Sequence, residues 1–155
     1  MAYPTGTPVK EQVLDNLKTT LELIAGGASY HTTLRGVHRL RGVNAMQLQQ
    51  FPAVIIDVAG TAHDDGVNGM VSCSMDVNLV AVITDRTDPA QELEWLAADI
   101  KRALLIDVTR GGAAVDTKFV SDDIQISDDV TSVAAVQVQA RVRFRHLYAD
   151  PNTSI

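Results

Sequence analysis

The stretch MVSCSMDVNLVAVITD, residues 70–85, constrains the fold of this chain most strongly. Apolar and polar side chains alternate along it, and a period of two is that of a β-strand with one buried face. The residues expected to face the core are Val71, Cys73, Met75, Val77, Leu79, Ala81 and Ile83. Val80 and Val82 make the other face apolar too, so the strand should be half exposed at its start and covered at its end.

A second long alternation predicts a last strand over residues 131–148, which ends in AVQVQARVRFRHLY. Its core-facing residues are expected to be Ala134, Val136, Val138, Ala140, Val142 and Phe144. Three of its polar positions, Arg141, Arg143 and Arg145, form an arginine row on the face that points away from the core. Shorter β-rich stretches predict strands over 32–40 and 53–60, and one or two short strands within 113–129.

Two other segments carry apolar residues at helical spacing. The first predicts a helix over 8–25, with Thr7 as its N-cap and Gly26 at its end. The second is expected to begin at Asp88, a good N-cap, and to end near 106–108. The expected buried stripes are Val9, Val13, Leu17, Leu21 and Ile24 in the first helix, and Leu93, Leu96, Ile100 and Leu104 in the second.

Each helix thus has one apolar stripe and most strands have one apolar face, so the two kinds of element can bury each other. We predict an α+β fold, a two-layer sandwich with both helices packed on one face of a mostly antiparallel sheet. The length of 155 residues suits one domain over 1–155, with 1–7 and 149–155 expected to be flexible ends. The polar stretch TAHDDGVNG, residues 61–69, is expected to be a loop.

The composition argues against several classes of protein. The net charge of −6 disfavours a general DNA or membrane binder, although it is compatible with a local basic patch. Cys73 is the only cysteine, so no intrachain disulfide can form, which fits a reducing compartment. No apolar run is long enough to cross a bilayer and the N-terminus has no apolar signal core, so we expect a soluble protein that stays in the cell.

Motifs of common enzyme and cofactor sites do not occur in the sequence. It contains no Walker loop, no Gly-x-Ser-x-Gly, no Cys-x-x-Cys and no His-Glu-x-x-His. Cys73 is expected to be an inert, packed thiol because it lies on the core face of a strand. We therefore expect no catalytic residue and no cofactor. The histidines share no ligand spacing; they are His31, His38, His63 and His146.

The best polar cluster in the sequence lies in the expected loop and consists of His63, Asp64, Asp65 and Asn68. Two carboxylates in a loop could bind a hard cation, and a small metal-dependent enzyme using His63, Asp64 and Asp65 is one alternative function. Adjacent carboxylates are also common in solvated turns. We favour either a solvated polar loop or a loop that contacts a partner.

The arginine row allows three interpretations. The first is ion pairing across the sheet, with Asp57 and Asp76 as the expected partners on neighbouring strands. The second is contact with another subunit or partner, because arginine is enriched at interfaces. Contact with nucleic acid is the third and least favoured, since no interleaved aromatic platform or helix-turn-helix signal accompanies the row.

The whole pattern resembles the tail terminator family (tail completion, minor tail protein) of long-tailed bacteriophages. Four features, which span about residues 8–147, carry the resemblance. They are VKEQVLDNLKTTLELI leading into YHTTLRGVHRL, the strand FPAVIIDVAG, the strand SMDVNLVAVITD leading into DPAQELEWLAADIKRALL, and the closing VQVQARVRFRH.

The resemblance implies structural work without catalysis or a cofactor. Members of the family are α+β proteins that form hexameric rings. The ring caps the completed tail tube, stops its polymerisation and presents a surface for head attachment, and DNA passes through its lumen. The expected partners are other copies of the chain, the tail tube protein and the head–tail connector protein. The expected location is the head-proximal end of the virion's tail, and the host cytoplasm during assembly. A head–tail joining protein of the phage neck is the alternative within the same class.

Overall fold

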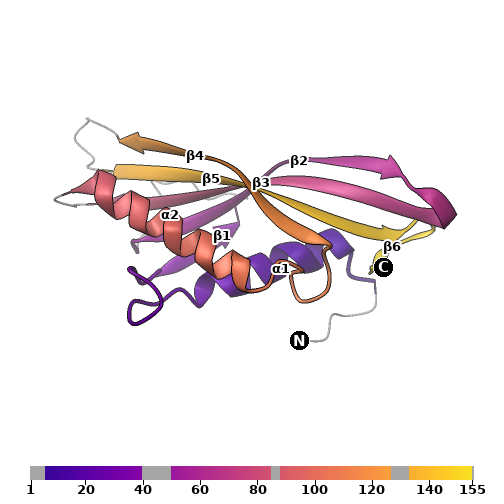
Figure 1. The fold of residues 1–155 in the computed structure, drawn as a ribbon, viewed down its shortest axis with the longest axis horizontal. Helices are drawn as coiled ribbons and strands as arrows, with labels where there is room; N and C mark the ends of the chain where they lie inside the picture. Colours follow the sequence, from indigo (N-terminus) through magenta and orange to yellow (C-terminus); the bar gives the residue numbers. More distant parts are fainter. Residues whose placement is uncertain (1–5, 40–49, 85–87, 127–132, 155) are drawn as a thin grey trace.

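The structure is a computed structural model that describes residues 6–39, 50–84, 88–126 and 133–154. Figure 1 shows two helices lying on the same side of a long, twisted sheet. The elements follow in the order α1 (Val9–Glu22), β1 (Gly36–Arg39), β2 (Ala53–Asp65), a short 3-10 turn (Val67–Gly69), β3 (Met70–Thr84), α2 (Pro89–Ile106), β4 (Asp116–Ile126), β5 (Val133–Leu147) and β6 (Asp150–Ser154).

The sheet has six strands in the order β1-β2-β3-β5-β4, with β6 paired to the end of β5. The β1–β2 pair is parallel and the remaining pairs are antiparallel. The long central strands β3 and β5 pair along their whole length, from Met70 opposite Leu147 to Thr84 opposite Val133. The predicted α+β sandwich with a mostly antiparallel sheet is therefore confirmed.

One core lies between the two helices and one face of the sheet. Every residue predicted to face the core from the two long strands is buried, and so is every residue of both predicted helical stripes. The agreement follows from periodicity, because burying one face of a strand or helix fixes its register. A second, small cluster covers the opposite face at the far end of β3 and consists of Ala53, Ile55 and Val82 with Val80 packed against it. The strand is thus covered on both faces at its end, as predicted.

The prediction of a loop over 61–69 is wrong for the first half of this range. β2 continues to Asp65, and residues 61–65 pair in antiparallel register with 71–75 of β3. Backbone pairing with a strong neighbouring strand outweighs the polar composition of this stretch. The turn is confined to Gly66–Gly69, where Asn68 and Gly69 take positive φ angles of 65° and 73°.

The ends of α1 and β1 differ from the sequence predictions. Helix α1 starts at Val9 with Pro8 at the N-cap position, so Thr7 does not cap it. The Thr7 carbonyl instead accepts a hydrogen bond from the Gln12 side chain at 3.0 Å. Strand β1 is shorter than predicted and spans Gly36–Arg39. The N-cap of α2 is confirmed, since the Asp88 carboxylate accepts from the Gln91 N–H at 3.2 Å.

The C-terminal residues predicted to be flexible contain strand β6. The Asp150 carboxylate accepts from the Asn152 N–H at 3.0 Å and from the Thr153 hydroxyl at 2.6 Å, which orders the chain as it turns back towards β5. Ser154 then pairs opposite His146. The predicted positions 1–5, 40, 85, 127–129, 131, 132 and 155 lie outside the described residues.

Candidate functional site

The arginine row lies in the middle of the sheet, on β5 between β3 and β4. Val142 and Phe144 alternate with the arginines and are buried in the core, so the row projects from the face opposite the helices. Arg141, Arg143 and Arg145 are all exposed. The face predicted for them is confirmed.

Arg141 is paired within its own chain. It lies opposite Asp76 of β3, and its Nε donates to Asp76 Oδ1 at 2.8 Å. This hydrogen bond and the charge of Asp76 raise the pKa of Arg141 above its ordinary value. The predicted contact with Asp76 is confirmed. The contact predicted with Asp57 is wrong, because Asp57 lies on β2, opposite Asn78 of β3, and β3 separates β2 from β5.

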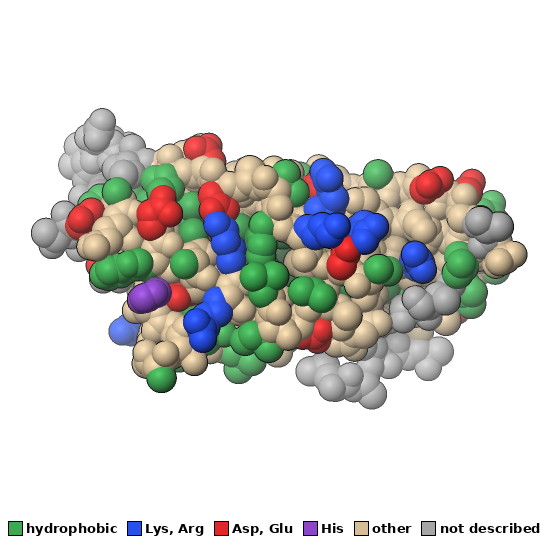
Figure 2. Space-filling view, in the orientation of Figure 1, with side chains coloured by type: hydrophobic (Ala, Val, Ile, Leu, Met, Phe, Trp, Pro, Cys, Tyr) green, Lys and Arg blue, Asp and Glu red, His purple; other side chains and the backbone are tan. Residues whose placement is uncertain are grey.

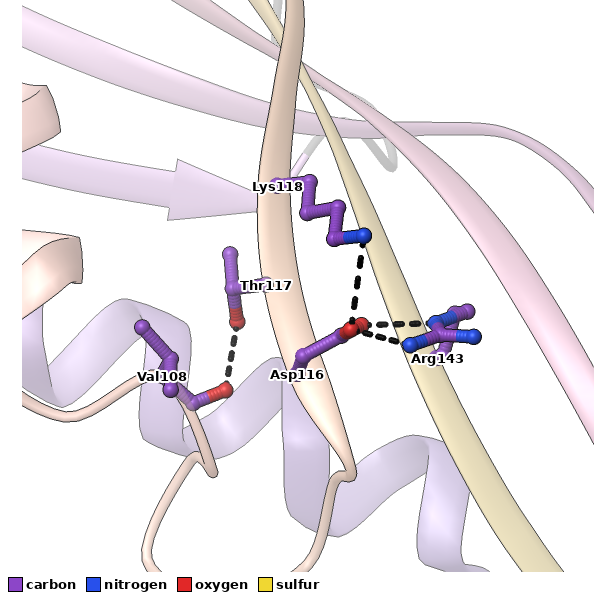
Figure 3. A network of polar contacts seen from close by, with 5 residues as sticks. All are labelled: Val108, Asp116, Thr117, Lys118 and Arg143. Carbon is purple, nitrogen blue, oxygen red and sulfur yellow. Dashed lines mark hydrogen bonds and ion pairs between the residues drawn. The ribbon is translucent and has the colours of Figure 1, made fainter.

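Arg143 is paired with an acidic residue that sequence reasoning missed. Its Nε donates to Asp116 Oδ1 at 2.8 Å, and its Nη2 contacts the second carboxylate oxygen (Figure 3). The hydrogen bonds from Arg143 hold the pKa of Asp116 below its usual range. Lys118 adds a weaker contact at 4.0 Å. The only signal that could have identified Asp116 is the register between β4 and β5, which the sequence does not specify.

The start of β4, which carries Asp116, is held from the helix side of the sheet. Thr117 is buried, and its hydroxyl donates to the Val108 carbonyl at 2.9 Å (Figure 3). Asp116 and Thr117 therefore point to opposite faces of β4. The carboxylate is presented to Arg143 by a strand that is anchored to the segment following α2.

Arg145 differs from the other two arginines. Among the residues that the structure describes, it forms no ion pair. It lies opposite Ser72 and next to a shallow pocket of about 250 Å³ on the same face. Asp64 lines the β2 side of this pocket, and Ser72 and Ser74 lie between it and the arginines. Arg145 is thus a cation with unused donors on an exposed face.

The acidic cluster predicted from the sequence does not converge on one point. His63, Asp64 and Asp65 are consecutive residues of β2, so their side chains alternate between the two faces of the sheet. Asn68 lies in the turn that follows. Asp64 belongs to the arginine face, where it lines the pocket beside Arg145. A hard-cation site using both neighbouring carboxylates therefore has no support in this geometry.

His63 instead lies close to two residues that are distant from it in the sequence, Cys73 and His146. It lies opposite Cys73 in the β2–β3 register, and His63 Nδ1 is 3.2 Å from Cys73 Sγ. His146 of β5 lies close by, and one potential ligand atom from each of the three residues falls within 4.8 Å of the others. Cys73 is buried, as predicted, and this burial raises the pKa of its thiol. We call these residues the His63–Cys73–His146 cluster.

Exposed apolar side chains occur in a second region, at the C-terminal end of α2. Leu105 and Ile106 are 54% and 76% exposed, although their neighbour Leu104 is fully buried. Lys101 on the same helix forms an ion pair with Asp122 of β4, next to these side chains. Large exposed hydrophobics beside charged groups are typical of protein contact surfaces.

Charges of both signs are mixed over the surface in view. Figure 2 shows several Lys and Arg side chains gathered near the middle of this view, with acidic side chains beside them. A surface of this kind differs from the continuous basic patch expected for a DNA-binding face. Among the described residues, no helix is both long and apolar enough to cross a membrane.

Comparisons with known proteins leave the family open. No protein-family model matches the chain, and neither does any curated protein sequence. Among solved structures, the chain is similar to one described as the virion of a native gene transfer agent (GTA) particle. The two share 11% sequence identity over 90% of this chain and 92% of that chain, with a TM-score of 0.38. Similarity at this level carries no functional argument.

Proposed function

We propose that the chain is a structural virion protein that forms a homo-oligomeric ring, as a hexamer. In this proposal the ring caps the completed tail tube of a long-tailed phage, stops tube polymerisation and offers the surface to which the head attaches. The chain has no catalytic role in it. Support comes first from the resemblance of element order and sequence over about residues 8–147. The α+β sandwich that this resemblance implies is the fold observed.

The observation that carries the proposal is the arginine row on the exposed sheet face, in which only some of the arginines form ion pairs. Arg141 and Arg143 each have a carboxylate partner across the sheet, whereas Arg145 has none among the described residues. Guanidinium groups present several donors, so even the paired arginines can donate to a further carboxylate or carbonyl group. A row of this kind suits a polar contact with a neighbouring subunit.

A ring also needs a second, different surface on the same chain. Closed rings form when one patch of a subunit contacts a complementary patch of the next subunit, in a head-to-tail arrangement. The edge strand β4 carries exposed acidic residues at Asp122 and Asp123, one strand away from the arginine row on β5. The exposed Leu105 and Ile106 lie nearby on α2. We propose this acidic and apolar edge as the surface that receives the arginine row of the neighbour.

Partner assignments follow from the same surfaces. The turn at Gly66–Gly69 and the polar end of β2, with Asp64 and Asp65, project at one end of the sheet and are proposed to contact the tail tube protein or the next subunit. The head–tail connector protein is the proposed partner on the opposite side of the ring. DNA is proposed to pass through the lumen without sequence-specific contact.

Native mass measurement with matched charge reversals tests this proposal. Arg145→Glu should reduce the ring population strongly, because it places a carboxylate in a row that must meet an acidic surface. Lys18→Glu is the control: Lys18 lies on α1 and pairs with Glu22 at 3.2 Å, on the helix side of the molecule. This variant should assemble as the wild type does. A wild-type protein that stays monomeric at high concentration and also fails to bind tail tubes would overturn the proposal.

A further inference from the structure

We propose that the His63–Cys73–His146 cluster is a binding site for a thiophilic divalent metal ion, with Zn²⁺ as the best fit. The proposal concerns this chain alone and does not depend on the proposed ring function. It rests on how the sheet register brings the three residues together, on the chemistry of their ligand atoms and on the hydrogen bond that orients His146.

The three residues come from three adjacent strands at the β2–β3 hairpin end of the sheet (Figure 1). His63 lies directly opposite Cys73, and His146 lies opposite Val71, which is two residues from Cys73 on the same face of β3. The side chains therefore share one face and form a short diagonal across β2, β3 and β5. Ligands placed on paired strands are held by backbone hydrogen bonds, which lowers the cost of assembling the site.

The separations suit a single small ion. Zinc binds thiolate at about 2.3 Å and imidazole nitrogen at about 2.0–2.1 Å in a tetrahedron, so neighbouring ligand atoms lie roughly 3.3–3.7 Å apart. The 3.2 Å distance from His63 Nδ1 to Cys73 Sγ is close to that range, and all three ligand atoms lie within 4.8 Å of one another. His63 is exposed, so its ring can adjust without disturbing the core.

The orientation of His146 leaves one nitrogen available. His146 Nδ1 is 2.8 Å from the Leu147 carbonyl oxygen. A carbonyl can only accept, so Nδ1 must carry the hydrogen and Nε2 holds the free lone pair. A ring N–H bonded to a backbone carbonyl is the arrangement that fixes the tautomer of metal-binding histidines.

The donor set selects the class of metal. One sulfur and two imidazole nitrogens favour zinc and other thiophilic transition metals over calcium or magnesium, which prefer oxygen ligands. Cys73 is only 3% exposed, so its sulfur lies at the base of the site, while His63 and His146 flank it towards solvent. Three protein ligands leave a fourth position for water or for a group from another molecule. A bound ion would link three strands at an end of the sheet.

Metal retention by the purified full-length chain is the first test. After treatment with a chelator and dialysis against Zn²⁺, the wild type should retain about one zinc ion per chain. His63→Gln and His146→Gln should each weaken zinc binding by at least about tenfold. His31→Gln is the matched control, because His31 stacks on Trp95 at 5.5 Å between ring centroids and is not part of the cluster. This variant should retain zinc as the wild type does.

Substitution with Co²⁺ tests the role of the thiol. The wild type should show a thiolate-to-cobalt charge-transfer band, and Cys73→Ala should lack it. His63→Gln is the variant that separates loss of metal binding from misfolding. His63 is exposed, so the metal-free variant should unfold at the same urea midpoint as the metal-free wild type. Addition of Zn²⁺ should raise the thermal midpoint of the wild type and of His31→Gln, but not that of His63→Gln.

Three results would each overturn the site. They are a wild type that retains no zinc, zinc retained equally by the wild type and His63→Gln, and a cobalt complex without the thiolate band. In each case the short contact between His63 and Cys73 would be a hydrogen bond and nothing more.

Discussion

The buried carboxylate of Asp99 holds the segment between α1 and β1. Asp99 lies on α2 and is only 1% exposed. It accepts from the His31 N–H at 3.0 Å, the Thr32 N–H at 2.8 Å and the Thr32 hydroxyl at 2.7 Å. The carboxylate therefore ties the segment between α1 and β1 to the second helix. Replacing Asp99 with alanine removes the acceptor for all three donors.

The expected cost follows from these contacts. A hydrogen bond to a charged group contributes about 1.5–3 kcal/mol, which sets an upper bound of about 4.5–9 kcal/mol for three. The three bonds share one carboxylate and the segment can turn part of its backbone towards water, so their contributions are not additive. We expect Asp99→Ala to lower the free energy of unfolding by about 3–4 kcal/mol.

Urea unfolding measures this cost as a lower midpoint with an unchanged slope. Thr32→Val serves as a graded control, since it removes only the hydroxyl donor and should cost about 1–2 kcal/mol. Trp95 is the single tryptophan and stacks on His31, so its fluorescence should change when the segment loosens in Asp99→Ala. An Asp99→Ala protein within about 1 kcal/mol of the wild type would refute the reasoning.

Three further predictions test local features. Hydrogen bonds from the Thr109 hydroxyl and the Gly111 N–H hold the pKa of Asp107 below its ordinary 3.8. This carboxylate therefore stabilises the fold above that pH and loses the effect as the pH falls through its lowered pKa. The gap in urea midpoint between wild type and Asp107→Asn should shrink from pH 7 towards pH 3, and a constant gap would contradict this. Gly69→Ala should cost about 1–2 kcal/mol because φ is 73° there, whereas Gly60→Ala, also in open space, should be near neutral in the same assay. Leu104→Ala should lower the free energy of unfolding by about 2–5 kcal/mol, and the exposed Leu105→Ala by less than about 0.5 kcal/mol. Equal losses would show that α2 does not bury the face that carries Leu104.

Periodicity made the buried parts of the fold predictable. The two long alternating strands and the two helical stripes each have one face that must be buried, and this requirement is visible in the order of residues. The residues of 61–65 were not predictable in the same way. They are polar, and they form a strand because residues 71–75 offer a partner of matching length across a tight turn.

The contacts of the candidate site depend on the register between neighbouring strands, which cannot be read from the sequence. Asp76 lies directly opposite Arg141 and was predictable as a partner on a neighbouring strand. Asp57 is not a partner of Arg141 because it lies on β2, opposite Asn78, and β3 separates that strand from β5. The pairing of Asp116 with Arg143, and the meeting of His63, Cys73 and His146, both require knowing which strands are neighbours and how they align. Residues that are far apart in sequence become neighbours only through that alignment.

The central claim is that the chain ends the growth of a tail tube. Electron micrographs of phage assembled without this protein test it most directly, with the length of tail tubes as the measured quantity. The account predicts overlong tube polymers, because no ring would cap the tube once it reaches its normal length. Tails of normal length beside separate heads would contradict the account, and would assign the chain to the connector side of the neck.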